Sequence, residues 1–386
     1  MTNKARSLLI RLGIAHFLVQ SQFWFPVWVL FLRHRGFTLG QIAAADAFFR
    51  VMVVLLEFPT GMLGDRLGRR RTYLLSCVFA TLAYASLVVV YNMPLLFVCW
   101  ALWAVFIALA SGTDTAYHYE LVAGHRPPAA VPYLMGVFRA VSAGALLLSH
   151  LSAGYLYSVH PALPFLCNAA FAVLAGAVIV SMPATVPGKR RSFARMLART
   201  WRIVRSDRGA AVPVVLSSAL LAYFWTTTLL YQPLLEALGF TPGSFGLVYV
   251  VISGAGIGAG LATGYLITRL GGSRLIVWGT AGMVVAVAAV GGGSAATCII
   301  GLSVLSGCFY LADETLKLLL NREIGDSIRA SILSLSSFLG SLLLIVSRPG
   351  IAMLAQHWSI RFAFQVWSAA GLIVLAVVIV AVWWRE

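Results

Sequence analysis

Ionisable side chains inside long apolar runs are the residues of this sequence that could do chemistry. Asp46, Arg50 and Glu57 are separated by four and then seven residues, which places all three on one face of a helix. Asp46 and Arg50 are spaced for an i,i+4 ion pair. Glu57 has no such cation and precedes Pro59. A carboxyl in lipid needs a partner or a proton, so Glu57 is either half of a structural ion pair or a proton-exchanging group.

A second cluster lies further along the chain. Asp114, Tyr117 and His118 share one helix face. A carboxylate beside an imidazole and a phenol can hold or relay a proton, and Asp114 has no cation at i,i+4 to keep it ionised. We therefore expect Asp114 to exchange a proton first, with Glu57 second and His118 as the group that would share it. The alternative is a hydrogen-bonded cluster that only fastens one helix to its neighbour.

Other buried charges have plainer explanations. Asp313 and Lys317 are spaced as an i,i+4 ion pair. Glu314 is then left without a cationic partner and is a candidate substrate contact. Arg139 lies about two turns inside its apolar run and should face an acid or a substrate anion. Arg348 is nearer the end of its run and is expected to snorkel towards the surface.

The elements that position these groups are membrane-spanning helices. The 386 residues are 60% hydrophobic and 10% charged, and the mean hydropathy is +0.91, which indicates an all-helical integral membrane protein. The absence of a nucleophile motif, metal-ligand spacing or soluble domain argues against an enzyme, and no cofactor is expected. Twelve spans are predicted near residues 8–32, 40–64, 72–91, 94–121, 131–158, 162–183, 211–238, 243–268, 274–292, 295–321, 328–356 and 360–384.

The basic residues give the orientation. The net charge of +16 lies in short segments between apolar runs, a pattern of membrane orientation and not of nucleic-acid binding. With the N-terminus inside, about 21 of the 28 Lys and Arg residues lie on the cytoplasmic side. We therefore predict a cytoplasmic (inner) membrane protein with both termini cytoplasmic. The basic segment 184–210 is predicted to link two halves, 1–183 and 211–386.

A charged turn follows the second predicted span. It reads G-x-x-x-D-R-x-G-R-R, at Gly61, Asp65, Arg66, Gly68, Arg69 and Arg70. Gly68 permits a positive φ where the chain turns, while the arginines lie against anionic headgroups. The turn resembles the loop between helices two and three of the major facilitator superfamily of secondary transporters. A second turn, from Gly264 through Thr268 and Arg269 to Gly271, keeps the glycines and one arginine but replaces the acid by Thr268.

The resemblance implies a fold and a gate. The superfamily has twelve transmembrane helices in two pseudo-symmetric six-helix halves, and the resemblance covers the whole chain. It implies that the charged turn is a conformational gate in which Asp65 docks near the start of span eleven, around Ser327 to Arg329, when the transporter is open outward. It also implies that aromatic and amide side chains of spans one and seven line a central cavity that suits an amphipathic ligand. Those residues are Gln20, Phe23, Trp24, Tyr223, Trp225, Tyr231 and Gln232.

These observations together predict a proton-coupled secondary transporter, monomeric in the bilayer, that exports amphipathic or cationic organic molecules by alternating access. Span five carries Gly136, Gly144 and Gly154 but not the G-P pair typical of superfamily antiporters, and the helix-four R-x-x-Q-G pattern is absent. Uptake of an organic anion held by Arg139 is therefore one alternative. A scaffold or receptor that transports nothing is another.

Overall fold

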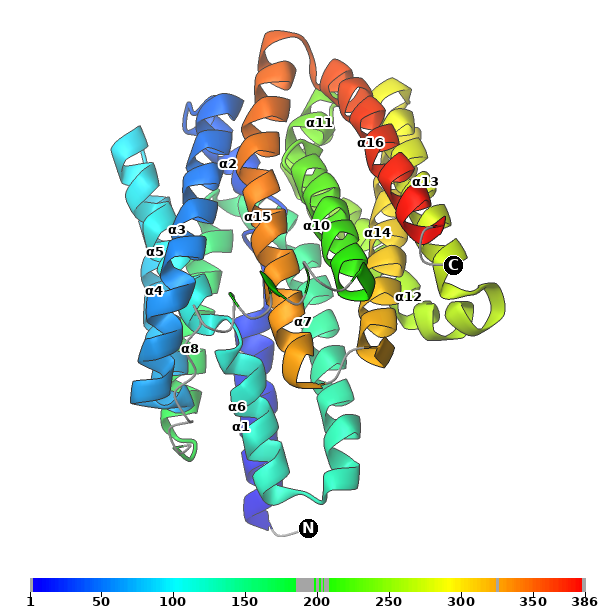
Figure 1. The fold of residues 1–386 in the computed structure, drawn as a ribbon. Helices are drawn as coiled ribbons and strands as arrows, with labels where there is room; N and C mark the ends of the chain where they lie inside the picture. Colours follow the sequence, from blue (N-terminus) through cyan, green and yellow to red (C-terminus); the bar gives the residue numbers. More distant parts are fainter. Residues whose placement is uncertain are drawn as a thin grey trace. The chain divides into compact units, whose positions relative to one another are not determined.

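The computed structural model contains helices throughout the described residues (Figure 1). It describes residues 3–184, 198, 201–202, 204, 208–323 and 326–383, without the side chains of 3–5, 58, 61–62, 65, 208–210, 321–323, 326–331 and 333. The basic linker 184–210 therefore lies largely outside the described residues. The helices are α1 Asn3–Gln20, α2 Trp28–His34, α3 Leu39–Leu67, α4 Arg69–Val88, α5 Met93–Ala110, α6 Thr113–His125, η1 Pro128–Ala130, α7 Val131–Val159, α8 Leu163–Val180, α10 Arg208–Thr228, α11 Tyr231–Ala237, α12 Pro242–Leu270, α13 Gly272–Gly292, α14 Ala295–Glu323, α15 Asp326–His357 and α16 Ile360–Trp383.

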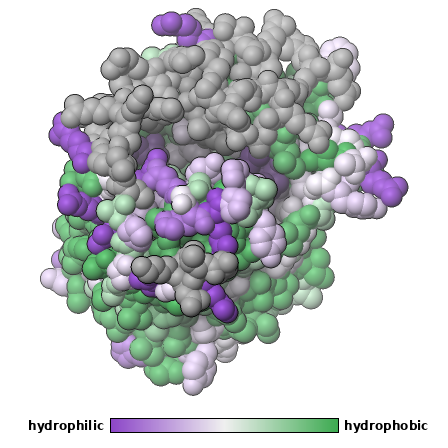
Figure 2. Space-filling view, turned by 90° about the horizontal axis from the view of Figure 1, so that it is seen from below, coloured by the Kyte–Doolittle hydropathy of each residue, from purple (hydrophilic) through white to green (hydrophobic). Residues whose placement is uncertain are grey.

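Eleven stretches of the described residues are long and apolar enough to cross a membrane, where twelve spans were predicted. The difference is α1, which carries Lys4, Arg6 and Arg11 within its 18 residues. Large apolar side chains are exposed on most of the other long helices, and hydrophobic residues cover much of the lower part of the view in Figure 2. This distribution suits a bundle surrounded by lipid.

The helices form two units with the same internal neighbours. In the first unit α4 packs on α5 and α8, and α1 packs on α7 and α8. In the second unit α13 packs on α14 and α16, and α10 packs on α15 and α16. The repeat predicted from the two glycine turns therefore extends to the packing, and the all-helical fold with two related halves is confirmed.

Each unit includes one short segment of the sequence half that otherwise forms the other unit. Leu32–Arg50 groups with the second unit, although the rest of α3 belongs to the first. Pro242–Gly246, the first turn of α12, groups with the first unit. The units of the fold thus differ from the sequence halves 1–183 and 211–386 at these two segments.

Three predicted spans are broken rather than continuous. The span 8–32 is α1 and α2 separated by turns at Ser21–Val27, and 211–238 is α10 and α11 separated at Leu229–Leu230. The span 94–121 breaks at Ser111–Gly112, where Gly112 has φ +69°. Pro26 lacks a backbone N–H, which explains the first break, and Gly112 takes a positive φ at no steric cost. A second Ser-Gly pair, Ser306–Gly307, lies inside the unbroken α14.

The charged turn is a single residue wide. The chain is helical up to Leu67, Gly68 has φ +80°, and α4 begins at Arg69. Gly271 joins α12 to α13 with φ +83°, so both predicted glycine turns are confirmed. Arg69 pairs with Glu120 of α6, and Arg70 donates to the Val180 carbonyl at 2.8 Å. The side chains of Asp65 and of Ser327 to Arg329 lie outside the described residues, so the docking of Asp65 stays a prediction.

Gly154 and Gly246 allow the backbone of α7 to pack directly against the backbone of the first turn of α12. A Cβ at Gly154 would lie 2.6 Å from the carbonyl oxygens of Pro242 and Gly243. A Cβ at Gly246 would lie 2.5 Å from the carbonyl oxygen of His150. Since the obstructing atoms are backbone, a larger residue requires the helices to separate.

We therefore expect Gly154→Ala to destabilise the protein, by about 1–3 kcal/mol as in other overpacked sites. Gly144→Ala in the same helix is the control, because nothing lies within 4 Å of the Cβ it adds and alanine favours a helix by about 0.5–1 kcal/mol over glycine. Thermal unfolding in detergent checks the difference. Equal melting temperatures for the two variants would show that this close approach does not stabilise the fold.

Candidate functional site

A cavity of about 340 Å³ lies within the first unit. It is formed by α1, the break that follows it, α4, α5 and the start of α6. Its walls combine large aromatic rings, two amides, a hydroxyl and one carboxyl. The lining residues are Val19, Gln20, Gln22, Trp24, Tyr84, Trp103, Phe106, Ile107, Ala110, Ser111 and Asp114.

The aromatic wall is a set of edge-to-face contacts. The Trp103 ring lies 4.4 Å from Trp24 and 4.8 Å from Tyr84, centroid to centroid, in T-shaped arrangements. Trp103 also lies 5.4 Å from Trp100. Such pairs contribute about 0.5–1.5 kcal/mol beyond the area they bury, so the wall is rigid before any ligand arrives.

Trp24 is positioned by a polar clamp on the break between α1 and α2. Asn168 of α8 accepts a hydrogen bond from the Trp24 N–H at 3.1 Å and donates to the Ser21 carbonyl at 2.7 Å. Ser149 of α7 accepts from the Gln22 N–H at 2.8 Å. These side chains replace the helical hydrogen bonds that the break removes, and a buried backbone group needs such a replacement.

Asp114 supplies the charge of the cavity. It lies in the first turn of α6, where the helix dipole favours a negative charge. Its carboxylate accepts hydrogen bonds from the N–H and hydroxyl of Thr115. The carboxyl is half-buried, and no cationic side chain of the described residues lies within 4.0 Å of it. An acid held in this way can bind a cation or a proton.

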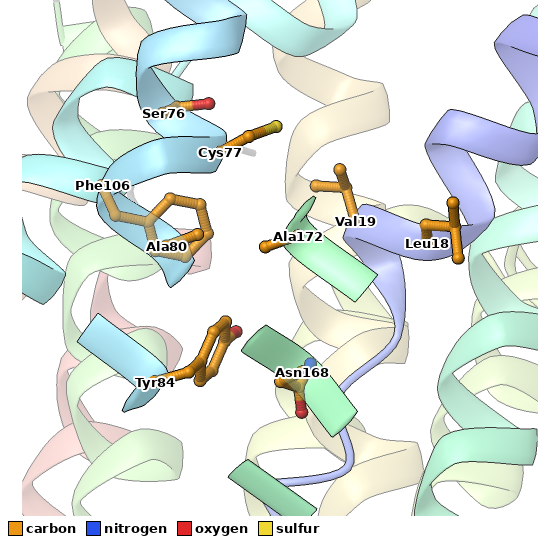
Figure 3. A pocket seen from close by; sticks show the side chains of 9 residues that line it. All are labelled: Leu18, Val19, Ser76, Cys77, Ala80, Tyr84, Phe106, Asn168 and Ala172. Atoms are coloured by element: carbon orange, nitrogen blue, oxygen red, sulfur yellow. The ribbon is translucent and has the colours of Figure 1, made fainter. Parts of the chain in front are cut away.

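A water-sized pocket lies behind the cavity and shares Val19, Tyr84 and Phe106 with it. Figure 3 shows side chains of α1, α4, α5 and α8 around it, with Tyr84 and Asn168 at the same end. Its volume of about 10 Å³ suits a single water. The pocket is an extension of the same site and not a separate one.

Comparison with known proteins gives the family. The model described as "Major Facilitator Superfamily" matches residues 12–312. This chain belongs to the Major Facilitator Superfamily. The resemblance seen in the charged turn is thereby confirmed for the family, which consists of transporters and not of enzymes.

Individual relatives of this superfamily member are distant. The "Uncharacterized MFS-type transporter YxaM" of Bacillus subtilis (strain 168) is 21% identical over 237 residues, which are 58% of each chain. Among solved structures, the nucleoside transporter NupG matches with a TM-score of 0.79 and 11% identity, over 98% of this chain and 99% of that one. The D-xylose-proton symporter matches with a TM-score of 0.78 and 13% identity, over 98% and 97%. At this identity the two structures show the fold alone.

Gln20 and Trp24, which were predicted to contact substrate, and Asp114, which was predicted to exchange a proton, are among the residues that line this cavity. The other predicted residues lie elsewhere in the described structure. Tyr223 is buried and stacks on Trp367 at 5.5 Å, and Tyr231 and Gln232 are buried in the packing of the second unit. Gln232 donates to the Tyr249 hydroxyl at 3.3 Å. Phe23 packs edge-on against Phe171, and Trp225 is half-buried beside Phe224. Core, lipid-facing and cavity aromatics look alike in a sequence.

The charged candidates also differ from expectation. Lys317 pairs with Asp313 at 2.6 Å as predicted, but it also pairs with Glu314 at 3.0 Å, so Glu314 is not left over. Arg139 is exposed, and no acid of the described residues lies within 4.0 Å of it. Glu57 is half-buried and has no ion pair among the described residues. His118 is buried and contacts the backbone carbonyl of Asp114, not its carboxylate.

Arg348 was predicted to snorkel, and the structure shows the opposite. It is buried in the second unit, where its guanidinium lies 2.7 Å from the Asp46 carboxylate and donates to the Trp225 carbonyl at 2.8 Å. Arg50 is the more distant partner of Asp46, at 3.8 Å. Breaking such a buried pair typically costs about 3–5 kcal/mol, so Asp46 is held in a structural ion pair.

Sequence reasoning missed Tyr84, Trp103, Asn168 and His16. Asn168 and His16 are polar residues inside apolar runs, which is the signal that could have singled them out. Tyr84 and Trp103 carry no such signal, because aromatic residues are common throughout the spans.

The hydrogen bonds from Asn168 to the break between α1 and α2 lead to a testable prediction. Asn168→Ala leaves the Trp24 N–H and the Ser21 carbonyl without their partner, at about 1–3 kcal/mol for each buried group. Asn92→Ala removes an exposed helix cap, the bond from the Leu95 N–H, and should cost about 1 kcal/mol. Thermal unfolding, monitored by tryptophan fluorescence, should give Asn168→Ala a clearly lower melting temperature than Asn92→Ala. Matching losses would show that the break does not depend on Asn168.

Proposed function

We propose that this protein is a proton-coupled secondary transporter that exports amphipathic organic cations through the cavity beside Asp114. The observation that carries the proposal is a half-buried carboxyl with no cationic partner among the described residues, in a cavity walled by aromatic rings. An unpaired carboxylate costs free energy in an apolar bundle. A cationic ligand or a proton removes that cost.

The cavity walls favour a cation that also has apolar surface. Trp24, Tyr84 and Trp103 offer ring faces and edges to an apolar or aromatic group. A cation near these rings gains about 0.5–2 kcal/mol from the ring quadrupoles, more when water is excluded. Asp114 neutralises the charge, and Gln20 and Gln22 supply hydrogen bonds that fix orientation.

Coupling follows if the cation and the proton compete for the same carboxyl. A proton entering from outside would displace the cation from Asp114, and a cation entering from inside would displace the proton. This competition is reciprocal, because each ligand weakens the other by the same factor. It yields exchange of one for the other, which is antiport.

Uptake of a neutral polar solute is the second candidate. Gln20, Gln22 and Ser111 lie in the same cavity as the tryptophans, a combination that can hold a sugar ring or a nucleoside by hydrogen bonds and stacking. The similar structures are those of a nucleoside transporter and a D-xylose-proton symporter. In this case Asp114 would accept a hydrogen bond from a hydroxyl instead of neutralising a charge.

The setting of the transporter is part of the proposal. We place it in the cytoplasmic membrane as a monomer, with both termini and the 184–210 linker on the cytoplasmic side, because the basic residues concentrate there. Asp65 and the arginines of its turn act as the gate, and Glu57 is the second acid available for proton exchange.

Transport by proteoliposomes tests the function. We expect an imposed proton gradient to drive tetraphenylphosphonium uphill, and Asp114→Asn to abolish this accumulation, since an amide neither ionises nor neutralises a cation. Glu57→Gln tests the second acid, which is also half-buried but is not among the residues that line the cavity. It should lower accumulation less than Asp114→Asn does.

Three outcomes would contradict the account. Accumulation that survives in Asp114→Asn but not in Glu57→Gln moves the coupling site to Glu57. Accumulation of uridine or D-xylose without tetraphenylphosphonium favours the neutral-solute candidate. No flux of any of the three probes under any gradient would favour a protein that does not transport.

A further inference from the structure

Two buried histidines face each other beside the cavity. His16 of α1 and His118 of α6 have ring centroids 4.7 Å apart, with planes inclined by 69°. These helices lie side by side in the first unit (Figure 1). The exposed fractions are 9% for His16 and 1% for His118. Phe138 of α7 packs edge-on against both rings.

The surroundings of His16 allow its hydrogen to lie on Nε2. Nε2 lies 3.1 Å from the Phe138 carbonyl oxygen and 2.7 Å from the Ser142 hydroxyl. The carbonyl can only accept, and the Ser142 hydroxyl lies 3.1 Å from it. In the neutral tautomer with hydrogen on Nε2, Nε2 donates to the carbonyl and Nδ1 has the lone pair. No partner for Nδ1 lies within hydrogen-bond distance among the described residues.

His118 is fixed in the complementary way. Its Nδ1 lies against the backbone carbonyl oxygen of Asp114, which can only accept, so Nδ1 carries the hydrogen. Nε2 then has the lone pair in the neutral ring. It too is buried and has no partner among the described residues. With hydrogen on His16 Nε2, two neutral rings in contact leave two acceptor nitrogens with no donor between them, and each costs about 1–3 kcal/mol.

We propose that His16 and His118 form a proton-binding site that holds one proton shared between them. The two free nitrogens are not hydrogen-bonded to each other in this structure. Once the rings turn towards each other, a proton on either nitrogen becomes an N–H that the other can accept, so one proton satisfies both. A second proton would place two like charges in contact, which opposes it. The bond from His118 to the Asp114 backbone places this site next to the proposed cation site, and its use in coupling rests on the proposed function.

Other ionisable groups around the pair are few. Tyr73 of α4 lies 6.2 Å from the His118 ring, and Tyr117 of α6 donates to the Pro183 carbonyl. Asp114 bonds Thr115 through its carboxylate. On α1, Arg11 donates to the Ser181 carbonyl at 3.0 Å, and on α7 Arg139 is exposed. The neighbouring α5 and α8 contribute only Cys99 and Cys167.

Conservative variants can abolish the shared proton and still keep the hydrogen bonds from each ring to its backbone carbonyl. His16→Gln keeps a donor near the position of Nε2, and His118→Asn keeps one near Nδ1, but neither retains the second nitrogen. His125→Asn is the matched control. His125 makes the same bond to the carbonyl four residues earlier on the same helix, at 2.9 Å to Leu121, and is exposed.

Nitrogen NMR of ¹⁵N-histidine-labelled protein in lipid tests the proposal on the full chain. We expect two rings to share a single protonation step. Either His16→Gln or His118→Asn should shift the midpoint of the remaining ring by about one pH unit or more, the coupling of an interacting pair. His125→Asn should leave that step unchanged.

Two results would overturn the proposal. Rings that stay neutral between about pH 5 and 8 would mean that only water bridges them, and rings that titrate independently would mean that no proton is shared. Tetraphenylphosphonium transport separates the two ideas. A shared proton without proton-driven transport defeats the proposed function alone, and proton-driven transport without a shared proton defeats the histidine site alone.

Discussion

A helix broken inside an apolar bundle must find new partners for the backbone groups it frees. In the first unit Asn168 and Ser149 meet this requirement for the break between α1 and α2. The break turns Trp24 towards Trp103, and Gly112 opens a second break that starts a new helix at Asp114. The cavity exists because both interruptions are tolerated, and both place backbone or side-chain polar groups where a ligand can reach them.

The same constraint separates structural charges from chemically available ones. Asp46 is enclosed by Arg348 and Arg50, and Asp313 is held by Lys317. Asp114 and the two free histidine nitrogens have no such partners among the described residues. In an apolar environment the unpaired groups are the ones whose free energy a proton or a cation can lower. The proposed function and the proposed proton site both rest on this difference.

Sequence reasoning succeeded where the physics is local. The glycine turns at Gly68 and Gly271 and the pair Asp313–Lys317 follow from backbone freedom and helical spacing. It found the pair of Asp46 with Arg50 but failed for Arg348, because nothing in the spacing of one helix reveals a partner on another. Tyr223, Tyr231 and Gln232 are buried in the structure, and their role as cavity residues stays a prediction, because burial in a helix interface and exposure to a cavity leave the same composition.

The central claim is that a cation and a proton compete at one site in the first unit. The most direct measurement is the number of protons that the purified protein releases on binding tetraphenylphosphonium in weakly buffered solution. Competition predicts release of about one proton per cation bound near the midpoint of the site, a consequence of linkage. Binding with no proton released at any pH between about 5 and 8 would contradict it.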